Sequence, residues 1–483
     1  MRYTAIALDY DGTIAHDGIV PPHVLDGLRR LKKSGRKLLL VTGRELEELL
    51  GIFPEIAVFD RVVAENGALM YRPQTGERKE LGEPPPDELI DALHAAKIPL
   101  SVGHTIIATV RPHEGVVLEA IARLGLEQQV IFNKGAVMVL PPGVNKASGL
   151  RVALQELGMS ARNVVAGGDG ENDHAMLEMA EYSVATANAI ETLKAAADYV
   201  TRETHGDGIL EVVAGMIESD LVSMPPRKPR RVLCIGRDST GHEVVLPTIH
   251  ASILVTGDPQ ATADLTAALM GRLCKAGYQF CALDTRAAYV DFKSAVVFGN
   301  PEKAPTVREA LTALDKPEVE TVVCLAGAPV EDRPAFVDKL LLPLRELRET
   351  LGRPHWIVVD EAQDLLPASA RADDSPSSAA ENTIYVSSDP MSLAPGVLAS
   401  VDGVVACGEQ AAATIDAFAA AVSWPRPTLP TTTVGRDQAL VWFRRSERPV
   451  SLIELARVKA DPASSKPERR EKSAEVGQVL RRA

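Results

Sequence analysis

The chain has 483 residues, which predicts two to four domains because one ordinary hydrophobic core rarely organises so many. Its composition is that of a globular protein, and its net charge of −13 argues against a general nucleic-acid or membrane-surface binder. The five cysteines show no C-x-x-C pairing, no apolar run is long enough to span a membrane, and the N-terminus does not resemble a signal peptide. We therefore expect a cytoplasmic protein without a disulfide framework or a zinc site.

The first predicted element is a short apolar run, residues 5–8, that stops at two acids. This pattern indicates a buried parallel strand with Asp9 at its carboxyl end and Asp11 in the following loop. The spacing of two lets both carboxyl groups face one small volume, which suits a magnesium ion and a phosphoryl group. The alternative is a strand followed by an Asx-turn, since Asp-Gly is common turn chemistry.

Polar residues also follow the next two predicted strands. A helical pattern over residues 22–33 leads to a strand at 37–41, which ends at Thr42, Gly43 and Arg44. The strand at 62–64 is followed by Glu65-Asn66-Gly67. Open α/β sheets bind ligands at the carboxyl ends of their strands, so these groups are candidate ligand contacts. Thr42 could instead simply cap the next helix.

The pattern of predicted elements changes between residues 78 and 142, where a helix and two strand-like runs occur twice in succession. The helices are expected at 87–97 and 113–124, and the strand-like runs at 99–102, 105–110, 130–133 and 136–140. This order predicts an antiparallel sheet with helices on one face, inserted into the parallel pattern. Its polar residues His104, Arg111 and Lys134 could select a ligand, but we interpret them as solvated surface.

The parallel pattern resumes with a helix over residues 146–157, a strand at 163–166 and the run Gly167-Gly168-Asp169-Gly170-Glu171-Asn172-Asp173. Lys146 stands in the first helical turn, where a cation opposes the helix dipole by roughly 0.3–1 kcal/mol. A bound phosphate would offset that cost. Asn172 could bind the phosphate or only shape its loop, and the pattern leaves both open.

Four motifs thus follow one another at strand or helix ends, namely Asp9-x-Asp11-Gly12-Thr13, Thr42-Gly43-Arg44, Lys146 and Gly168-Asp169-x-x-Asn172-Asp173. In this order, with a small insertion between the second and third, they resemble the haloacid dehalogenase superfamily of phosphatases, and in particular its Cof-type IIB branch. The resemblance covers roughly residues 1–221. It implies a doubly wound parallel α/β core (1–77 and 143–222) and an inserted α+β cap of the C2 type (78–142).

The resemblance also implies roles for these residues. Asp9 would be the nucleophile that forms an aspartyl phosphate, and Asp11 the general acid and base. Magnesium would be held by the Asp9 carboxylate, the Asp11 backbone carbonyl and Asp169, with Asp173 orienting its water shell. The phosphate- and substrate-binding residues would be Thr42, Gly43, Arg44, Asn66, Lys146 and Asn172.

A proline- and charge-rich linker is expected at residues 223–231, followed by a second parallel α/β domain at 232–457. Residues 253–259 and 356–363 resemble P-loop ATPases of the DNA-translocase kind. The second segment looks like an intact Walker B, with Asp360 and Glu361. The first is degenerate, because Thr262, Ala263 and Asp264 stand where Gly, Lys and Ser or Thr belong. The charged residues 458–483 are expected to form a disordered tail.

The sequence therefore predicts a magnesium-dependent phosphatase of a small phosphorylated metabolite, with a sugar phosphate as the expected class. One alternative is a regulatory or partner-binding protein whose P-loop-like domain senses a nucleotide. Another is a nucleotide-driven translocase, which the missing lysine at position 263 disfavours. The C-terminal domain could also serve a protein partner or self-association.

Overall fold

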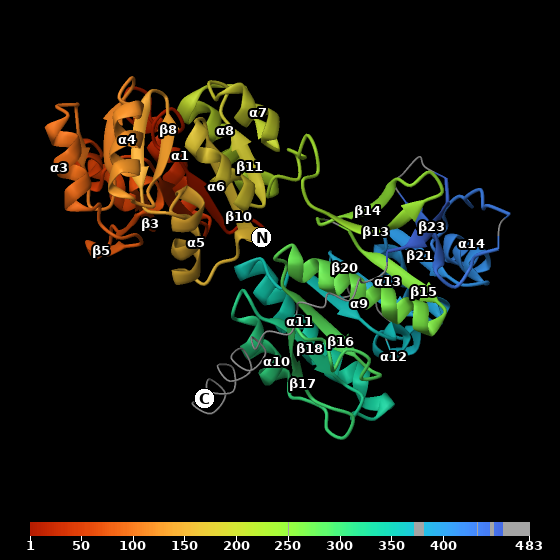
Figure 1. Cartoon of the computed structure of the whole chain (residues 1–483). Coiled ribbons are helices and arrows are strands. Elements are labelled where there is room, and N and C mark those ends of the chain that lie inside the picture. Colours follow the sequence, from red (N-terminus) through yellow and green to blue (C-terminus); the bar gives the residue numbers. More distant parts are fainter. Residues whose placement is uncertain (250, 371–380, 432, 445–448, 457–483) are drawn as a thin grey trace. The chain divides into compact units, whose positions relative to one another are not determined.

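The computed structural model describes residues 1–249, 251–370, 381–431, 433–444 and 449–456 (Figure 1). The chain divides into two compact units, Met1–Pro229 (unit 1) and Arg230–Ala483 (unit 2). The division falls within the linker that the sequence predicts. The predicted tail, 458–483, lies outside the described residues.

Unit 1 is built on a sheet of eight strands in its described residues. In spatial order these are β12 (Tyr199–Val200), β11 (Tyr182–Ala185), β10 (Val164–Gly168), β1 (Ala5–Leu8), β2 (Lys37–Val41), β3 (Arg61–Ala64), β4 (Leu69–Arg72) and β5 (Glu77–Glu80). The first six are parallel, and β4 and β5 continue the sheet antiparallel. β1 therefore lies in the interior of the sheet, with both faces covered.

The helices of this core are α1 (Pro22–Lys33), α2 (Leu46–Ile52), α5 (Lys146–Glu156), α6 (His174–Met179), α7 (Glu191–Ala196) and α8 (His205–Ser219). Side chains alternate across β1. Ile6 and Leu8 join a buried cluster with residues of α1 and α8, whereas Ala5 and Ala7 join another with residues of α5 and α6. Helices thus cover both faces, which confirms the doubly wound α/β core.

The cap of unit 1 has a separate antiparallel sheet, ordered β6 (Ser101–Val102), β7 (Ile107–Val110), β9 (Ala136–Leu140), β8 (Gln129–Asn133). Its helices are α3 (Asp87–Ala95) and α4 (Glu114–Leu124). Leu93, Ile121 and Val139 belong to the buried cluster between these helices and one sheet face. Met138 on the other face packs with Ala68 of the core.

The cap begins later in the chain than predicted. β5 pairs with β4 in the core sheet, so residues 78–80 belong to the core rather than to the insertion. All four residues of β5 are exposed and charged, as suits an edge strand. Such a strand carries neither apolar alternation nor a buried run, and the sequence pattern therefore misses it.

Unit 2 contains a mixed sheet of eleven strands in its described residues. Their spatial order is β14 (Glu243–Pro247), β13 (Val232–Asp238), β23 (Ser451–Leu455), β22 (Gln438–Phe443), β21 (Gly403–Cys407), β15 (Ile253–Gly257), β20 (Thr383–Ser387), β19 (Trp356–Val359), β16 (Phe280–Asp284), β18 (Glu320–Cys324) and β17 (Ala295–Phe298). The strands from β21 to β17 are parallel. The other four are antiparallel, which corrects the prediction of a parallel α/β domain to one with a mixed sheet.

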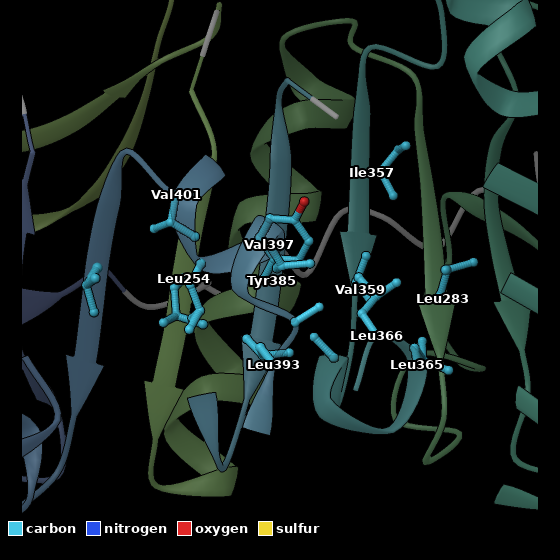
Figure 2. Close-up of a cluster of buried hydrophobic side chains, with 14 of the residues drawn as sticks. Leu254, Leu283, Ile357, Val359, Leu365, Leu366, Tyr385, Leu393, Val397 and Val401 are labelled. Atoms are coloured by element: carbon cyan, nitrogen blue, oxygen red, sulfur yellow. The ribbon is translucent and has the colours of Figure 1, made fainter. Parts of the chain in front are cut away.

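The helices of unit 2 are α9 (Pro259–Lys275), α10 (Val307–Leu314), α11 (Arg333–Leu351), α12 (Ala362–Leu365), α13 (Pro395–Ser400) and α14 (Ala411–Ala421). Figure 2 shows one buried face of the sheet, where Leu254, Val359 and Tyr385 meet residues such as Leu365 and Val397. Leu265, Leu269 and Leu273 of α9 belong to a second buried cluster with other residues of the same strands. In the described ranges, no helix combines the length and apolar character needed to cross a membrane.

Candidate active site

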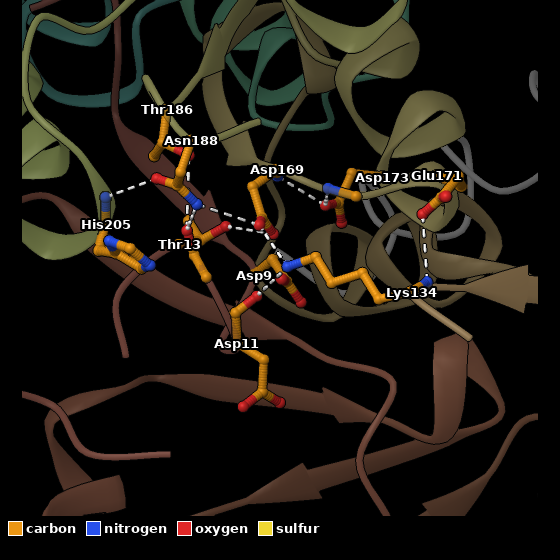
Figure 3. A network of polar contacts seen from close by, with 12 residues as sticks. Asp9, Asp11, Thr13, Lys134, Asp169, Glu171, Asp173, Thr186, Asn188 and His205 are labelled. Carbon is orange, nitrogen blue, oxygen red and sulfur yellow. Dashed lines mark hydrogen bonds and ion pairs between the residues drawn. The ribbon is translucent and has the colours of Figure 1, made fainter. Parts of the chain in front are cut away.

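Most of the predicted site residues of unit 1 lie at one edge of its sheet. Asp9 follows β1, Thr42 follows β2, and Asp169 follows β10. These strands are parallel neighbours, so their carboxyl ends meet at the same edge. Figure 3 shows Asp9 close to Asp169 there. Asp173 joins them from the short helix η4 (Glu171–Asp173).

A buried lysine joins two of these acids. Lys146 begins α5, directly after Asn145, whose side chain caps the helix by accepting from the Ser148 N–H. The Lys146 Nζ donates to Asp9 Oδ1 at 2.5 Å and to Asp173 Oδ1 at 2.6 Å. Only 1% of the lysine is exposed. In the structure, two carboxylates therefore offset the unfavourable position of this cation at a helix N-terminus.

Burial dominates the ionisation of this cluster. It raises the pKa of Asp9 to about 7, the Asp173 carboxylate adds to the rise, and Lys146 opposes it. Burial by itself would lower the pKa of Lys146, but Asp173 and Asp9 outweigh it and hold that pKa above its ordinary value. Lys146 therefore stays protonated and positively charged beside the Asp9 carboxyl group.

Three carboxylates form a cluster that could bind a metal ion. Asp9, Asp169 and Asp173 each offer an oxygen, and these atoms lie within 4.8 Å of one another. Buried carboxylate oxygens are the ligands preferred by hard divalent cations such as Mg²⁺, so the donor set fits that ion. Asp173 also shapes the loop, since its Oδ2 accepts from the backbone N–H groups of Asp169 and Gly170, both at 2.9 Å.

Asp11 differs from the prediction. Its carboxylate does not share a volume with that of Asp9 but points away (Figure 3) and accepts two hydrogen bonds from Arg44. The Nε–Oδ2 distance is 2.6 Å and the Nη2–Oδ1 distance 2.8 Å. A paired guanidinium is a strong competitor for a carboxylate, and the spacing of two could not reveal this partner from the next strand. The backbone carbonyl of Asp11, by contrast, accepts from the Lys134 Nζ at 3.3 Å, and the same Nζ donates to Asp169 Oδ2.

The remaining predicted residues gather beside this pair. Thr42 Oγ1 accepts from the Arg44 N–H at 3.1 Å, whereas the N-cap of α2 is Glu45, so Thr42 does not cap that helix. Asn172 Nδ2 donates to Asn66 Oδ1 at 2.7 Å. Gly43 lies against both amides, since a Cβ atom there would be 3.3 Å from the Asn66 side chain and 3.5 Å from that of Asn172.

The structure corrects the interpretation of Lys134 as solvated surface. Its Nζ donates to Asp169 Oδ2 and, at 3.3 Å, to the Asp11 backbone carbonyl. The sequence predicts the turn between the two cap strands, but it does not show that Lys134 in this turn contacts residues of the core. Arg111 is exposed and lies over the Phe132 ring at 5.1 Å.

Two further contacts of Asp169 were missed. Asn188 Nδ2 donates to Asp169 Oδ2 at 3.2 Å and to the Gly12 carbonyl at 2.8 Å. Thr13 Oγ1 donates to Asp169 Oδ1 at 3.4 Å. Thr13 belongs to the first motif and offered a signal, whereas nothing in the sequence around Asn188 marks it.

A cavity of about 200 Å³ lies between core and cap. It is lined by Glu45, Leu46, Glu47, Glu65, Val102, Gly103 and His104. The buried Glu65 carboxylate accepts from the backbone N–H groups of His104 at 3.1 Å and Thr105 at 2.8 Å, which fixes the cap loop to the core. His104 thus lines a cavity beside the site, although it was predicted to be solvated surface.

The acids predicted for unit 2 also lie at the carboxyl edge of its sheet. Asp360 follows β19, is fully buried, and accepts from Arg286 Nε at 3.1 Å and Nη2 at 2.8 Å. Arg286 Nη1 lies 2.9 Å from Glu361 Oε1. Burial raises the pKa of Asp360 to about 6, against the effect of Arg286.

The segment compared with Walker A takes a different form from a phosphate-binding loop. After β15, only Asp258 precedes α9, and its side chain caps that helix by accepting from the Ala261 N–H at 2.9 Å. Thr262, Ala263 and Asp264 are therefore already helical. No loop remains between the strand and the helix to surround a phosphate.

Comparisons with known proteins extend these observations. A family model described as haloacid dehalogenase-like hydrolase matches residues 6–102 and 121–213. A phosphoglycolate phosphatase of Methanothermobacter thermautotrophicus is 32% identical over 219 residues, which cover 43% of this chain and 96% of that protein. Phosphoglycolate phosphatase 2 of Saccharolobus solfataricus is 30% identical over 218 residues, covering 43% and 90%. A solved haloacid dehalogenase-like hydrolase from Bacteroides thetaiotaomicron is 21% identical, covers 44% of this chain and 99% of its own, and gives a TM-score of 0.40.

Proposed function

Because the chain belongs to the haloacid dehalogenase-like hydrolases and is a phosphatase of that family, we propose that unit 1 hydrolyses a small phosphorylated metabolite with Mg²⁺ as cofactor. The observation that carries this proposal is the buried cluster of Asp9, Asp169 and Asp173 around Lys146 at the carboxyl edge of the sheet. The proposed nucleophile, the carboxylates proposed as metal ligands and the positively charged Lys146 thus lie in one small volume.

Asp9 is the proposed nucleophile. Its carboxylate oxygen attacks phosphorus, the bond to the leaving oxygen breaks, and an aspartyl phosphate forms. Asp11 gives a proton to the leaving oxygen and then takes one from the water that hydrolyses the intermediate. Since Arg44 holds the Asp11 carboxylate in the structure, this role requires Asp11 to exchange Arg44 for the leaving group.

The proposed metal ligands are the carboxylates of Asp9 and Asp169 and the backbone carbonyl of Asp11. A bound divalent cation supplies positive charge that neutralises the phosphoryl group and the acids around it. Asp173 holds the loop of Asp169 through two backbone N–H groups and also fixes Lys146. We assign it to orienting the ion's surroundings.

Phosphate binding is assigned to the residues that lie beside the acids. Lys146 supplies a buried positive charge beside Asp9, where the phosphoryl group would be transferred. Thr42 offers a hydroxyl. Backbone N–H groups around Gly43, together with the side chains of Arg44, Asn66 and Asn172, complete the set. Polar groups held in place by the fold stabilise developing charge without reorganising.

Two substrate classes follow from different observations. The cavity between core and cap is lined by Glu45, Glu47 and His104, and such groups accept hydrogen bonds from hydroxyls, which favours a sugar phosphate. The relatives named phosphoglycolate phosphatase favour a phosphorylated carboxylic acid instead, and the cationic Lys134 beside the acids would suit that second anionic group.

A panel of metabolite phosphates tests this proposal. Phosphate release is measured for sugar phosphates and phosphoglycolate with Mg²⁺ and with chelator, and the Asp9→Asn variant controls for contaminating phosphatases. We expect one class to dominate, with turnover lost in chelator and in the variant. Turnover that survives chelation would contradict the metal assignment, and turnover by the variant would contradict the nucleophile.

For unit 2 we propose a degenerate P-loop NTPase-like domain that binds a partner or supports self-association rather than hydrolysing ATP. The helix that starts at Pro259 leaves no phosphate loop, and position 263 is alanine. Arg286 neutralises the two acids, Asp360 and Glu361, that would otherwise face a metal ion.

A further inference from the structure

The tip of a cap hairpin reaches the acids of the core. Lys134 and Gly135 form the turn between β8 and β9, with φ values of 46° and 90°. From this turn the Lys134 Nζ extends to Asp169 Oδ2 and to the Asp11 backbone carbonyl (Figure 3). In unit 1, these two groups belong to the proposed metal-ligand set.

Several features fit the turn to this position. The Lys134 N–H donates to Glu171 Oε2 at 3.4 Å, next to the Asp169 loop, and the Arg111 N–H donates to the Gly135 carbonyl at 2.9 Å. Gly12 has a φ of 85°, and a Cβ atom there would lie 2.1 Å from Asp169 Oδ2 and 2.5 Å from the Lys134 Nζ, so a larger residue would disturb this contact. The contact is therefore accommodated by both the cap and the core.

A lysine ammonium and a divalent cation cannot share the same oxygen ligands, because two like charges would be held within a few ångströms. On the premise of the proposed phosphatase, we infer that Lys134 is a cap-borne cation that competes with the metal ion for Asp169. Metal binding displaces Lys134 and removes the ionic contact of this hairpin tip with the core. By linkage, the Lys134 contact weakens metal binding by the same factor.

The displaced ammonium has a ready partner once substrate binds. The side chain is 44% exposed and its stem is flexible, so it can move from Asp169 to an anionic group of the substrate beside the metal. Lys134 thus acts as a positioning residue. The hairpin tip contacts the core acids when metal is absent, contacts the substrate when both metal and substrate are bound, and is released when metal binds alone. Glu65 holds the loop of His104 and Thr105 in each case.

Calorimetric titration of the full chain with MgCl₂, without substrate, tests the competition. We expect Lys134→Met to bind Mg²⁺ at least about fivefold more tightly than the wild type, the lower end of typical coupling. Lys97→Met is a matched control, because Lys97 is also an exposed cap lysine with positive φ (55°). It should bind Mg²⁺ as the wild type does.

Hydrogen exchange read by mass spectrometry supplies a second measure. In the wild type and Lys97→Met, Mg²⁺ should speed exchange of backbone amides in residues 129–140, and in Lys134→Met it should not. Equal Mg²⁺ affinity of all three proteins, or a metal response of the hairpin that persists in Lys134→Met, overturns the inference and leaves the phosphatase proposal intact. Absence of Mg²⁺ binding in all three overturns the metal site itself and the inference with it.

Discussion

Replacing Arg286 by methionine should destabilise unit 2 in a pH-dependent manner. Arg286 places two donors on Asp360 and a third nitrogen near Glu361, while Asp360 is fully buried. Removing one partner of a buried ion pair costs about 3–5 kcal/mol, because the other charge is left uncompensated. Since 31% of the Arg286 side chain is exposed, water screens part of this loss, and we expect about 3 kcal/mol at pH 8.

The sign of the pH dependence follows from the raised pKa of Asp360. Burial lifts it from 3.8 to about 6 in the folded protein, so wild-type stability falls as the pH rises through this window. Without Arg286 the folded pKa rises further, and the additional loss accumulates above pH 6. At pH 5 the carboxyl group is largely protonated in both proteins, and the difference should shrink to about 1 kcal/mol, the value of a neutral hydrogen bond.

Urea unfolding followed by tryptophan fluorescence measures this effect selectively. All three tryptophans, Trp356, Trp424 and Trp442, lie in unit 2, so the signal reports on that unit. Arg308→Met, at an exposed position of α10, is the control for removing a positive charge. A loss of the same size at pH 5 and pH 8, or none at either, would refute the assignment of Arg286 as the partner of a buried charge.

The remaining predictions concern catalysis. Asp9→Asn should lower phosphate release by at least about 10³-fold, since it removes the nucleophile, and a rate within tenfold of the wild type would exclude Asp9 from that role. Asp169→Asn should shift the Mg²⁺ titration of activity to concentrations at least about tenfold higher, and an unchanged titration would argue against Asp169 as a ligand. In the Asp9→Asn background, the full chain should show no Mg²⁺-dependent ATP turnover; a rate near 1 per second that Glu361→Gln abolishes would restore the ATPase reading.

Much of the site in the core of unit 1 could be predicted from local sequence patterns. An apolar run that stops at an acid predicts the end of a buried strand, and parallel neighbours place such ends at one edge. The sequence therefore predicted that Asp9 and Asp169 lie close together, and in the structure their carboxylates are close. Lys146 was recognisable for a similar reason, because a cation at a helix start calls for a nearby negative charge.

The direction of side chains and the reach of distant loops were decided only by the tertiary structure. Arg44 turns the Asp11 carboxylate away from Asp9, and Lys134 crosses from the cap to Asp169. Neither contact could be predicted from a repeating pattern in the sequence. Each joins side chains from separate elements, and the packing of the folded chain decides whether those elements meet. The sequence determined which chemical groups stand at the sheet edge, whereas long-range electrostatic pairing within the folded chain determined which of them face one another.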